Sequence, residues 1–366
     1  DKATGEISKR KTVEGFKPNT DIVWQPVNNI STYKSEQYLW NQVRKYIWEH
    51  VDIFAGYDIL TAWVFASWTP EKWDAVPYLF FYGPPASGKT WALQVLASIG
   101  FRSLASPSAT LSTIFRAIEQ WKPTFFLDET EIYMQTERQE ILHLLNAGYR
   151  KGQKVLRTED TKYGRQVKPY DCFGFKALAG TKGLIATLKS RCIIFNMTEA
   201  TRDIKETINN EKAKELQQML LLYRFKMLSK KEKMEKPGIL KGRLRELFDP
   251  LIIVAPLSAK QSIIAEAKKI ERIRIEEEQA SDEAVVFKAA LDIYQAQPQR
   301  KITINKITKA TNENLGVYDQ ITNVSIGRIL AKLGFKKTME KHKRAIYWNV
   351  ELAKRLKRRY CHAEPT

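Results

Sequence analysis

The sequence predicts an α/β protein in which a parallel sheet is flanked by helices and is followed by a helical region and a small C-terminal domain. Two apolar runs of strand length, residues 78–82 and 124–127, each lead into residues that can bind a ligand. Residues 83–90 follow the first run, and Asp128 and Glu129 follow the second. Ligands bind at the carboxyl ends of strands in open α/β sheets, so both runs are predicted to be buried strands of one sheet.

The segment after the first strand has the pattern of a phosphate-binding loop. It fits Gly-x4-Gly-Lys-Thr completely, and Leu93, Leu96 and Ala97 then fall on one face of a helix that Gly100 can end. In such a loop the backbone N–H groups surround the phosphates, the lysine adds positive charge and the threonine hydroxyl binds Mg2+. We therefore expect ATP and Mg2+ as cofactors, bound by Gly83, Pro84, Pro85, Ala86, Ser87, Gly88, Lys89 and Thr90. The alternative is a Gly/Pro turn before an ordinary helix.

The acidic pair after the second strand predicts hydrolysis rather than nucleotide binding alone. Asp128 is expected to complete the Mg2+ site together with Thr90. Glu129 is expected to orient and deprotonate the attacking water. The alternative is a strand end with two solvated acids, but the preceding phosphate loop favours the catalytic interpretation.

Composition and charge favour a nucleic-acid partner. The chain has 366 residues and a formal net charge of +19, and its apolar stretches are broken by charges before they reach membrane-spanning length. The three cysteines, Cys172, Cys192 and Cys361, have no metal-binding spacing and are too few for a disulfide framework. We expect a reducing, cytoplasmic compartment and no membrane association. Because the chain begins at Asp1, we also expect it to be a fragment of a longer protein.

Four regions are predicted along the chain. Residues 1–30 are a polar extension or linker, residues 31–200 the ATPase core with its N-terminal helices, residues 201–280 a helical lid with a charged linker helix, and residues 281–366 a DNA-binding domain. Aromatic residues crowd the start of the core, and core packing is favoured over base stacking. These residues are Trp40, Trp48, Trp63, Trp68 and Trp73.

A basic β-hairpin is predicted after a helix at residues 137–145. Two short strand-like runs flank a polar, glycine-containing tip at residues 159–164. Its positive charge suits contact with DNA phosphates, although a solvated basic hairpin without function is the alternative. The basic residues are Lys154, Arg157, Lys162, Arg165 and Lys168.

The order of the remaining core elements resembles that of a known protein family. They are a strand at residues 173–180 ending at Thr181, a short helix at 184–189, the Ser190-Arg191 pair and a strand at 192–197. From about residue 31 to the end, the chain resembles AAA+ ATPases, and more closely the helicase modules of plasmids, phages and mobile cassettes, which are compact relatives of the minichromosome-maintenance helicases. The resemblance implies an AAA+ P-loop NTPase core with a helical lid and a C-terminal winged helix.

The same resemblance implies roles for further residues. Thr181 occupies the sensor-1 position, where many relatives have Asn, and Arg191 matches the arginine finger that reaches the nucleotide of a neighbouring subunit. Arg243, with Arg245 as the alternative, matches sensor 2. A salt-bridged helix end is the alternative for Arg191, and an ordinary surface arginine is the alternative for Arg243. The basic hairpin corresponds to the one that lines the central channel of such rings.

The C-terminal region is predicted to be a winged helix. Helices are expected near residues 287–294 and 305–314, a strand at 301–303, and wing strands at 336–339 and 344–350 with Ile346, Trp348 and Val350 pointing inward. A third helix buries Ile326, Ile329, Leu330 and Leu333 and leaves basic side chains outside. Residues 301–366 contain 15 Lys and Arg against 5 Asp and Glu. This excess favours DNA over a protein partner, with Arg328, Lys332, Lys336 and Lys337 as the predicted contacts.

These observations predict an ATP-dependent, ring-forming DNA helicase, the replicative helicase or initiator of a mobile genetic element. The resemblance implies a homo-hexamer with single-stranded DNA in its channel and duplex DNA at the winged helix. The alternative is a DNA-bound AAA+ loader or assembly switch that separates no strands. A structural DNA-binding protein with an inactive nucleotide site is disfavoured, because Lys89, Asp128 and Glu129 are all present.

Overall fold

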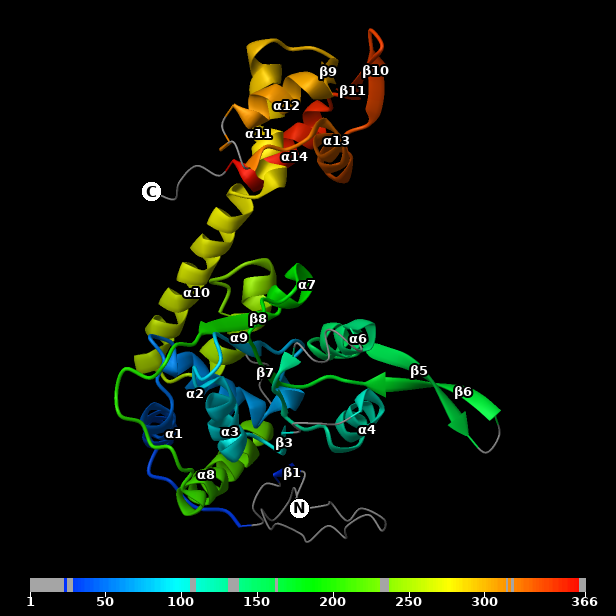
Figure 1. Cartoon of the computed structure of the whole chain (residues 1–366). Coiled ribbons are helices and arrows are strands. Elements are labelled where there is room, and N and C mark those ends of the chain that lie inside the picture. Colours follow the sequence, from blue (N-terminus) through cyan, green and yellow to red (C-terminus); the bar gives the residue numbers. More distant parts are fainter. Residues whose placement is uncertain are drawn as a thin grey trace. The chain divides into compact units, whose positions relative to one another are not determined.

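The computed structural model divides into two compact units, Asp1–Ala267 and Lys268–Thr366, and the boundary falls inside helix α10 (Leu257–Gln279). Figure 1 shows the elements of each unit. The structure describes residues 23–24, 29–105, 110–130, 138–161, 164–230, 237–313, 315–316 and 319–361.

A six-stranded sheet forms the centre of the first unit, and its strand order is β1-β3-β4-β7-β2-β8. The strands are β1 (Val23–Trp24), β2 (Tyr78–Tyr82), β3 (Ser103–Ala105), β4 (Phe125–Leu127), β7 (Lys176–Gly180) and β8 (Cys192–Asn196). The five strands from β3 to β8 are parallel, and β1 pairs antiparallel with β3. This is the predicted P-loop NTPase core, a parallel sheet flanked by helices. The β1 pairing lies in the segment predicted to be an extension.

The register of the central strands brings their carboxyl ends to one edge of the sheet. β7 lies between β2 and β4, with Tyr82 opposite Gly180 and Leu127 opposite Leu178. All residues of β4 and β7 are buried, as expected for parallel strands covered on both faces. The residues that follow β2, β4 and β7 therefore meet at the same edge.

Helices cover this sheet. They are α1 (Glu36–His50), α2 (Tyr57–Ser67), η1 (Pro70–Lys72), α3 (Lys89–Ile99), α4 (Leu111–Trp121), α6 (Arg138–Gly148), α7 (Ala186–Lys189), α8 (Asn210–Ser229) and α9 (Gly242–Val254). The predicted aromatic core is confirmed for Trp40, Trp63, Trp68 and Trp73. Trp48 is the exception: its side chain is 46% exposed, and the Arg202 guanidinium stacks on its ring at 4.3 Å.

The second unit combines helices with a small antiparallel sheet of order β10-β11-β9. Its elements are α11 (Asp282–Ala296), β9 (Lys301–Thr303), α12 (Ile304–Asn312), α13 (Asn323–Lys332), β10 (Lys337–Glu340), β11 (Lys343–Tyr347) and α14 (Val350–Tyr360). Ile326 and Leu330 of α13 and Ile346 of β11 share one hydrophobic core, as predicted.

One prediction for this unit is wrong. Val350 does not point inward from a strand; it is 46% exposed and begins helix α14. The physical reason is Asn349, whose side chain accepts a hydrogen bond from the Leu352 N–H and so caps a helix. Trp348 still packs inward, stacked between Tyr294 and Phe335.

Candidate nucleotide-binding and DNA-contact sites

The phosphate loop joins β2 directly to α3 and is held closely against the sheet. A Cβ atom at Gly83 would lie 2.3 Å from the Met197 carbonyl oxygen, so only glycine fits at this position. Ala86 and Gly88 both have a positive φ, 62° and 79°, and this turns the chain into the amino end of α3. The loop therefore has the tight geometry that its sequence predicts.

Lys89 places its ammonium group within this loop. Its side chain is buried, and Nζ donates to the Pro84 carbonyl at 2.5 Å and to Ser87 Oγ at 3.3 Å. Thr90 follows in the first turn of α3 and is exposed. A helix amino end, an ammonium group and a hydroxyl make a donor set that fits the phosphates of ATP and the Mg2+ bound to them.

The acidic pair lies beside the loop, because β7 alone separates β4 from β2. The Thr130 hydroxyl donates to the Ala179 carbonyl at 3.1 Å and so fastens the acidic turn to β7. Asp128 Oδ1 accepts the Glu129 N–H at 2.8 Å, and Glu129 is exposed with a left-handed backbone (φ 48°). The described part of the chain has no group of three or more His, Cys, Asp or Glu side chains that could hold a metal. Mg2+ bound to ATP takes oxygen ligands from the phosphates, and Asp128 would add a carboxylate oxygen.

Thr181 directly follows β7 and is exposed at the same edge. The structure thus places Lys89, Thr90, Asp128, Glu129 and Thr181 at the carboxyl ends of three adjacent strands.

Arg191 lies at the opposite, amino edge of the sheet. It directly precedes β8, and its carbonyl oxygen accepts the N–H of Tyr78, the first residue of β2, at 3.1 Å. Its guanidinium lies over the ring of Tyr149, whose backbone oxygen accepts the Val76 N–H just before β2. A five-residue strand at about 3.3 Å per residue separates this edge from the phosphate loop by roughly 15 Å.

Arg243 lies beside Arg191, away from the phosphate loop of its own chain. Its guanidinium also lies 4.7 Å from the centre of the Tyr149 ring, and it forms a salt bridge with Glu246 at 3.0 Å. Burial and the nearby Arg243 charge lower the pKa of Arg191. Neither the meeting of these arginines nor the tyrosine between them was predicted from the sequence.

The predicted basic hairpin is present as β5 (Lys154–Thr161) and β6 (Gly164–Asp171), and Figure 1 shows it extending beyond α4 and α6. Its basic residues differ in their surroundings. Arg157 is held at 2.9 Å by Glu140 and lies over the Phe115 ring, whereas Lys154 is exposed. Arg165 is exposed and pairs with Asp160 across the hairpin. Lys162 lies outside the described residues.

The outer face of the hairpin also carries apolar side chains. Leu156 and Val167 are each about two-thirds exposed. They alternate along their strands with Arg157, which lies over Phe115, and with Lys168, whose ammonium group lies over the Tyr170 ring. Residues opposite one another in an antiparallel pair share a face, so Lys154, Leu156 and Val167 lie on the same outer face. The sequence analysis considered only the charges of this hairpin.

A groove of about 530 Å³ separates α13 from the β10–β11 hairpin. Arg328, Lys337 and Arg344 line it, with Val324 and Met339 between them. Arg344 was not among the predicted DNA contacts. The other two predicted contacts do not line the groove: Lys332 pairs with Glu283 at 2.6 Å, and Lys336 is exposed elsewhere.

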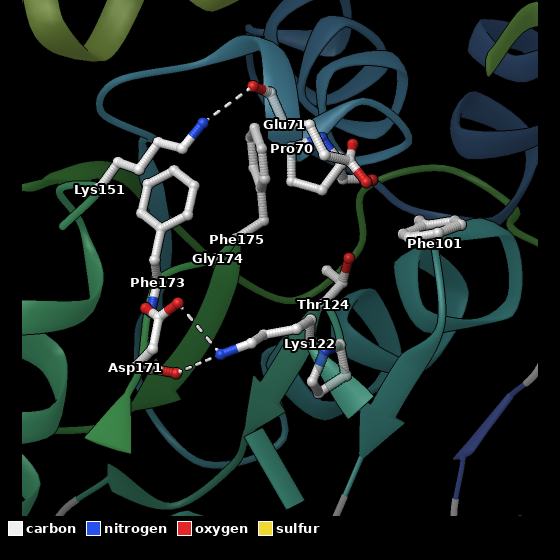
Figure 2. A pocket seen from close by; sticks show the side chains of 12 residues that line it. Pro70, Glu71, Phe101, Lys122, Thr124, Lys151, Asp171, Phe173, Gly174 and Phe175 are labelled. Atoms are coloured by element: carbon white, nitrogen blue, oxygen red, sulfur yellow. Dashed lines mark hydrogen bonds and ion pairs between the residues drawn. The ribbon is translucent and has the colours of Figure 1, made fainter. Parts of the chain in front are cut away.

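A smaller cavity of about 210 Å³ lies in the first unit, at the edge of the sheet where β4 and β7 begin (Figure 2). Phe101, Phe173 and Phe175 are among the residues that line it. Lys122 pairs with Asp171 at 3.1 Å along one side. On another side, Lys151 Nζ donates a hydrogen bond to the Glu71 carbonyl at 3.2 Å.

Phe54 is a further residue that the sequence analysis missed. Its side chain is 99% exposed on the loop between α1 and α2. The Trp91 indole N–H donates to the His50 carbonyl at 2.8 Å, which fixes the start of that loop against the first turn of α3.

Comparison with known proteins gives structural neighbours only. No protein-family model and no curated protein matches the chain. Similar solved structures include the NrS-1 C-terminal region (11% identity, 89% of this chain and 79% of that chain, TM-score 0.42) and the active helicase Cch of SCCmec type IV (12%, 86% and 70%, 0.40). JCV helicase is also similar (13%, 68% and 65%, 0.27). Likeness at these scores says nothing about activity or partners, which have to follow from the residues of this chain. In the part of the chain that the structure describes, no helix combines the length and apolar character needed to cross a membrane.

Proposed function

We propose that this protein is an ATP-dependent DNA helicase that works as a ring of identical subunits, a hexamer by family resemblance. One observation carries this proposal. The nucleotide-binding residues lie at the carboxyl edge of the sheet, whereas Arg191 and Arg243 lie at its amino edge. Roughly 15 Å of strand separates the two groups, so one chain cannot bring them to the same phosphate.

A second copy of the chain can supply what the first lacks. If each subunit presents its amino edge to the phosphate loop of the next, the contact is head-to-tail and repeats until the ring closes. Arginine side chains that reach a γ-phosphate in this way stabilise the charge that develops in the transition state. Arg191 and Arg243 would then complete the site of the neighbouring subunit together.

Within each site the reaction is the hydrolysis of ATP to ADP and phosphate. Lys89 and the amino end of α3 hold the β- and γ-phosphates, and Thr90 and Asp128 would hold Mg2+, which supplies further positive charge. Glu129 accepts a proton from the water that attacks the γ-phosphorus, and ADP leaves with the bridging oxygen. The Thr181 hydroxyl would orient this water from the end of β7, and the exposed Phe54 ring would stack on the base.

DNA contacts are assigned to both units. The outer hairpin face, with Lys154 and Arg165, would follow single-stranded DNA in the channel as ATP turns over. The groove lined by Arg328, Lys337 and Arg344 suits duplex DNA, as in a winged helix. Such a helicase could serve as the replicative helicase or initiator of a mobile genetic element.

Unwinding of a forked duplex tests this function against that of a loader or switch. We expect the purified chain to separate the strands with ATP and Mg2+, and to stop doing so with a non-hydrolysable analogue. Turnover of ATP that is stimulated by DNA but releases no strand, on forks with either polarity of tail, would favour the loader instead.

A further inference from the structure

Tyr149 lies where the two arginines meet. It follows α6 directly, and its side chain is buried. The guanidinium carbons of Arg191 and Arg243 each lie 4.7 Å from the centre of its ring. Arg243 also donates a hydrogen bond to the Tyr149 hydroxyl. One aromatic side chain therefore contacts both groups that are proposed to act on the neighbouring nucleotide.

The two arginines carry positive charges close together, and a carboxylate, that of Glu246, is bonded to Arg243. Glu246 accepts hydrogen bonds from the Tyr149 hydroxyl at 3.2 Å and from Arg243 at 3.0 Å, and it also pairs with Arg150. Arg191 is held by the ring face of Tyr149 and by a hydrogen bond to the Thr187 carbonyl. Its Nε is buried and makes no hydrogen bond.

The backbone beside Tyr149 is fastened to the base of the hairpin. The Gly174 N–H donates to the Gly148 carbonyl at 3.1 Å. A Cβ at Gly148 would lie 2.4 Å from the Cys172 carbonyl oxygen and 2.6 Å from Lys176 Nζ, so the two segments are in direct contact. The buried Lys176 ammonium donates to the Cys172 and Gly174 carbonyls at 2.8 and 3.0 Å and fixes this turn.

Both ends of the hairpin are also fixed around the cavity in Figure 2. On one side Lys151, two residues after Tyr149, donates to the Glu71 carbonyl at 3.2 Å. On the other side Asp171, the last residue of β6, pairs with Lys122. A force on the hairpin is therefore transmitted to packed and hydrogen-bonded groups, among them the backbone of Tyr149.

We propose that Tyr149 is a positioning residue that holds Arg191 and Arg243 together and links them to the base of the DNA-contacting hairpin. This inference rests on the proposed function, since it takes the two arginines to act at the neighbour's nucleotide. Through Gly148 and Tyr149, a hairpin that moves with DNA changes the position of the arginines at the next site.

Replacement of Tyr149 tests the proposal. Tyr149→Leu removes the ring and is expected to lower kcat for DNA-stimulated ATP hydrolysis at least about tenfold, because arginines that reach a neighbouring phosphate contribute more than that. KM for ATP should stay within about twofold, since the chain's own phosphate loop is intact. Tyr149→Phe keeps the ring face and should stay within about threefold of the parent.

Mixing experiments separate positioning from general damage to the fold. Tyr149→Leu has an intact phosphate loop and lacks only what it supplies to its neighbour. It should therefore recover activity when mixed with Lys89→Ala, and it should not recover when mixed with Arg191→Ala. If Tyr149→Leu does not fold, Glu246→Gln carries the same test, with an expected loss of about threefold and the same mixing pattern.

Two results would overturn the proposal. One is a parental kcat in Tyr149→Leu or, where that variant does not fold, in Glu246→Gln. The other is failure of the Tyr149→Leu mixture with Lys89→Ala under conditions in which Arg191→Ala recovers with Lys89→Ala. If Arg191→Ala fails to recover as well, the shared site itself is wrong, and the inference falls with it.

Discussion

Glu129 has a backbone conformation that is uncommon for residues other than glycine. It is exposed in a left-handed backbone conformation at the end of a buried strand, in a turn that Thr130 fastens to β7. If it accepts the proton of the attacking water, Glu129→Gln should lower ATP turnover by about 100-fold or more while ATP binding persists. Single-turnover hydrolysis and binding of a fluorescent ATP analogue measure the two separately.

The matched control is Glu215→Gln on the exposed surface of α8, where the carboxylate pairs with Lys212. This variant should hydrolyse ATP at the parental rate. Equal loss of binding and turnover in Glu129→Gln would contradict the assignment of Glu129 as the base.

Lys176 gives the fold a pH dependence of known sign. Burial lowers the pKa of its ammonium group to about 8, below the ordinary value of 10.5. Above pH 8 the folded chain releases this proton while the unfolded chain keeps it, so stability rises with pH by up to about 1.4 kcal/mol per unit. Burial raises the pKa of the neighbouring Cys172 to about 11, which opposes the trend above pH 9.

Urea denaturation between pH 7 and 9 measures this contribution. The parent should gain stability from pH 8 to 9, and Lys176→Met should show a smaller slope over the same interval. Parallel curves for the two proteins would mean that Lys176 is not held as the structure indicates.

The basic residues of the hairpin fall into two groups, one proposed to contact DNA and one that supports the structure. Lys154 and Arg165 are exposed on its outer face, whereas Arg157 is held by Glu140 and Phe115. Replacing Lys154 and Arg165 with Ala should abolish unwinding while basal ATP hydrolysis persists, because the catalytic residues lie on other strands. Arg157→Ala should instead lower the thermal midpoint. Parental unwinding by the double variant, measured on a fluorescent fork, would count against the hairpin.

In the second unit, some basic residues line the groove and others lie outside it. Arg328 and Arg344 line it, whereas Lys332 pairs with Glu283 outside it. Replacing both arginines with Ala should weaken duplex binding and reduce the slope of log K against log salt by about one per lost phosphate contact. Lys332→Ala is the control and should keep the parental slope. An unchanged slope in the double variant would place duplex DNA on another surface.

These elements also show what the sequence could and could not predict. Apolar runs such as Tyr78–Tyr82 are strands because they are buried on both faces, and the motif at their ends located the phosphate loop. Helix α14 was missed because the alternation through Trp348 and Val350 has the period of a strand, while one capping side chain decides the outcome. No local pattern reveals that Arg243 meets Tyr149, since this contact spans 94 residues and depends on the folded sheet.

The proposed assembly assigns a role to each of the two edges of the sheet. Each subunit has a phosphate loop with Lys89 and Glu129 at one edge and a pair of arginines at the other. In the proposed ring there would be as many composite sites as subunits, and hydrolysis at each site would depend on two chains. The hairpin and the second unit would then supply the proposed DNA contacts.

The central claim is that every active site is shared, and ATP turnover in mixtures of inactive variants tests it directly. Lys89→Ala and Arg191→Ala should each be inactive alone. An equal mixture should recover about a quarter of the parental turnover, because about one interface in four then joins an intact loop to an intact arginine. Lys89→Ala mixed with Glu129→Gln is the control, and it should recover nothing because both changes lie in the same half of the site. No recovery in a Lys89→Ala and Arg191→Ala mixture shown by cross-linking to co-assemble would contradict the account.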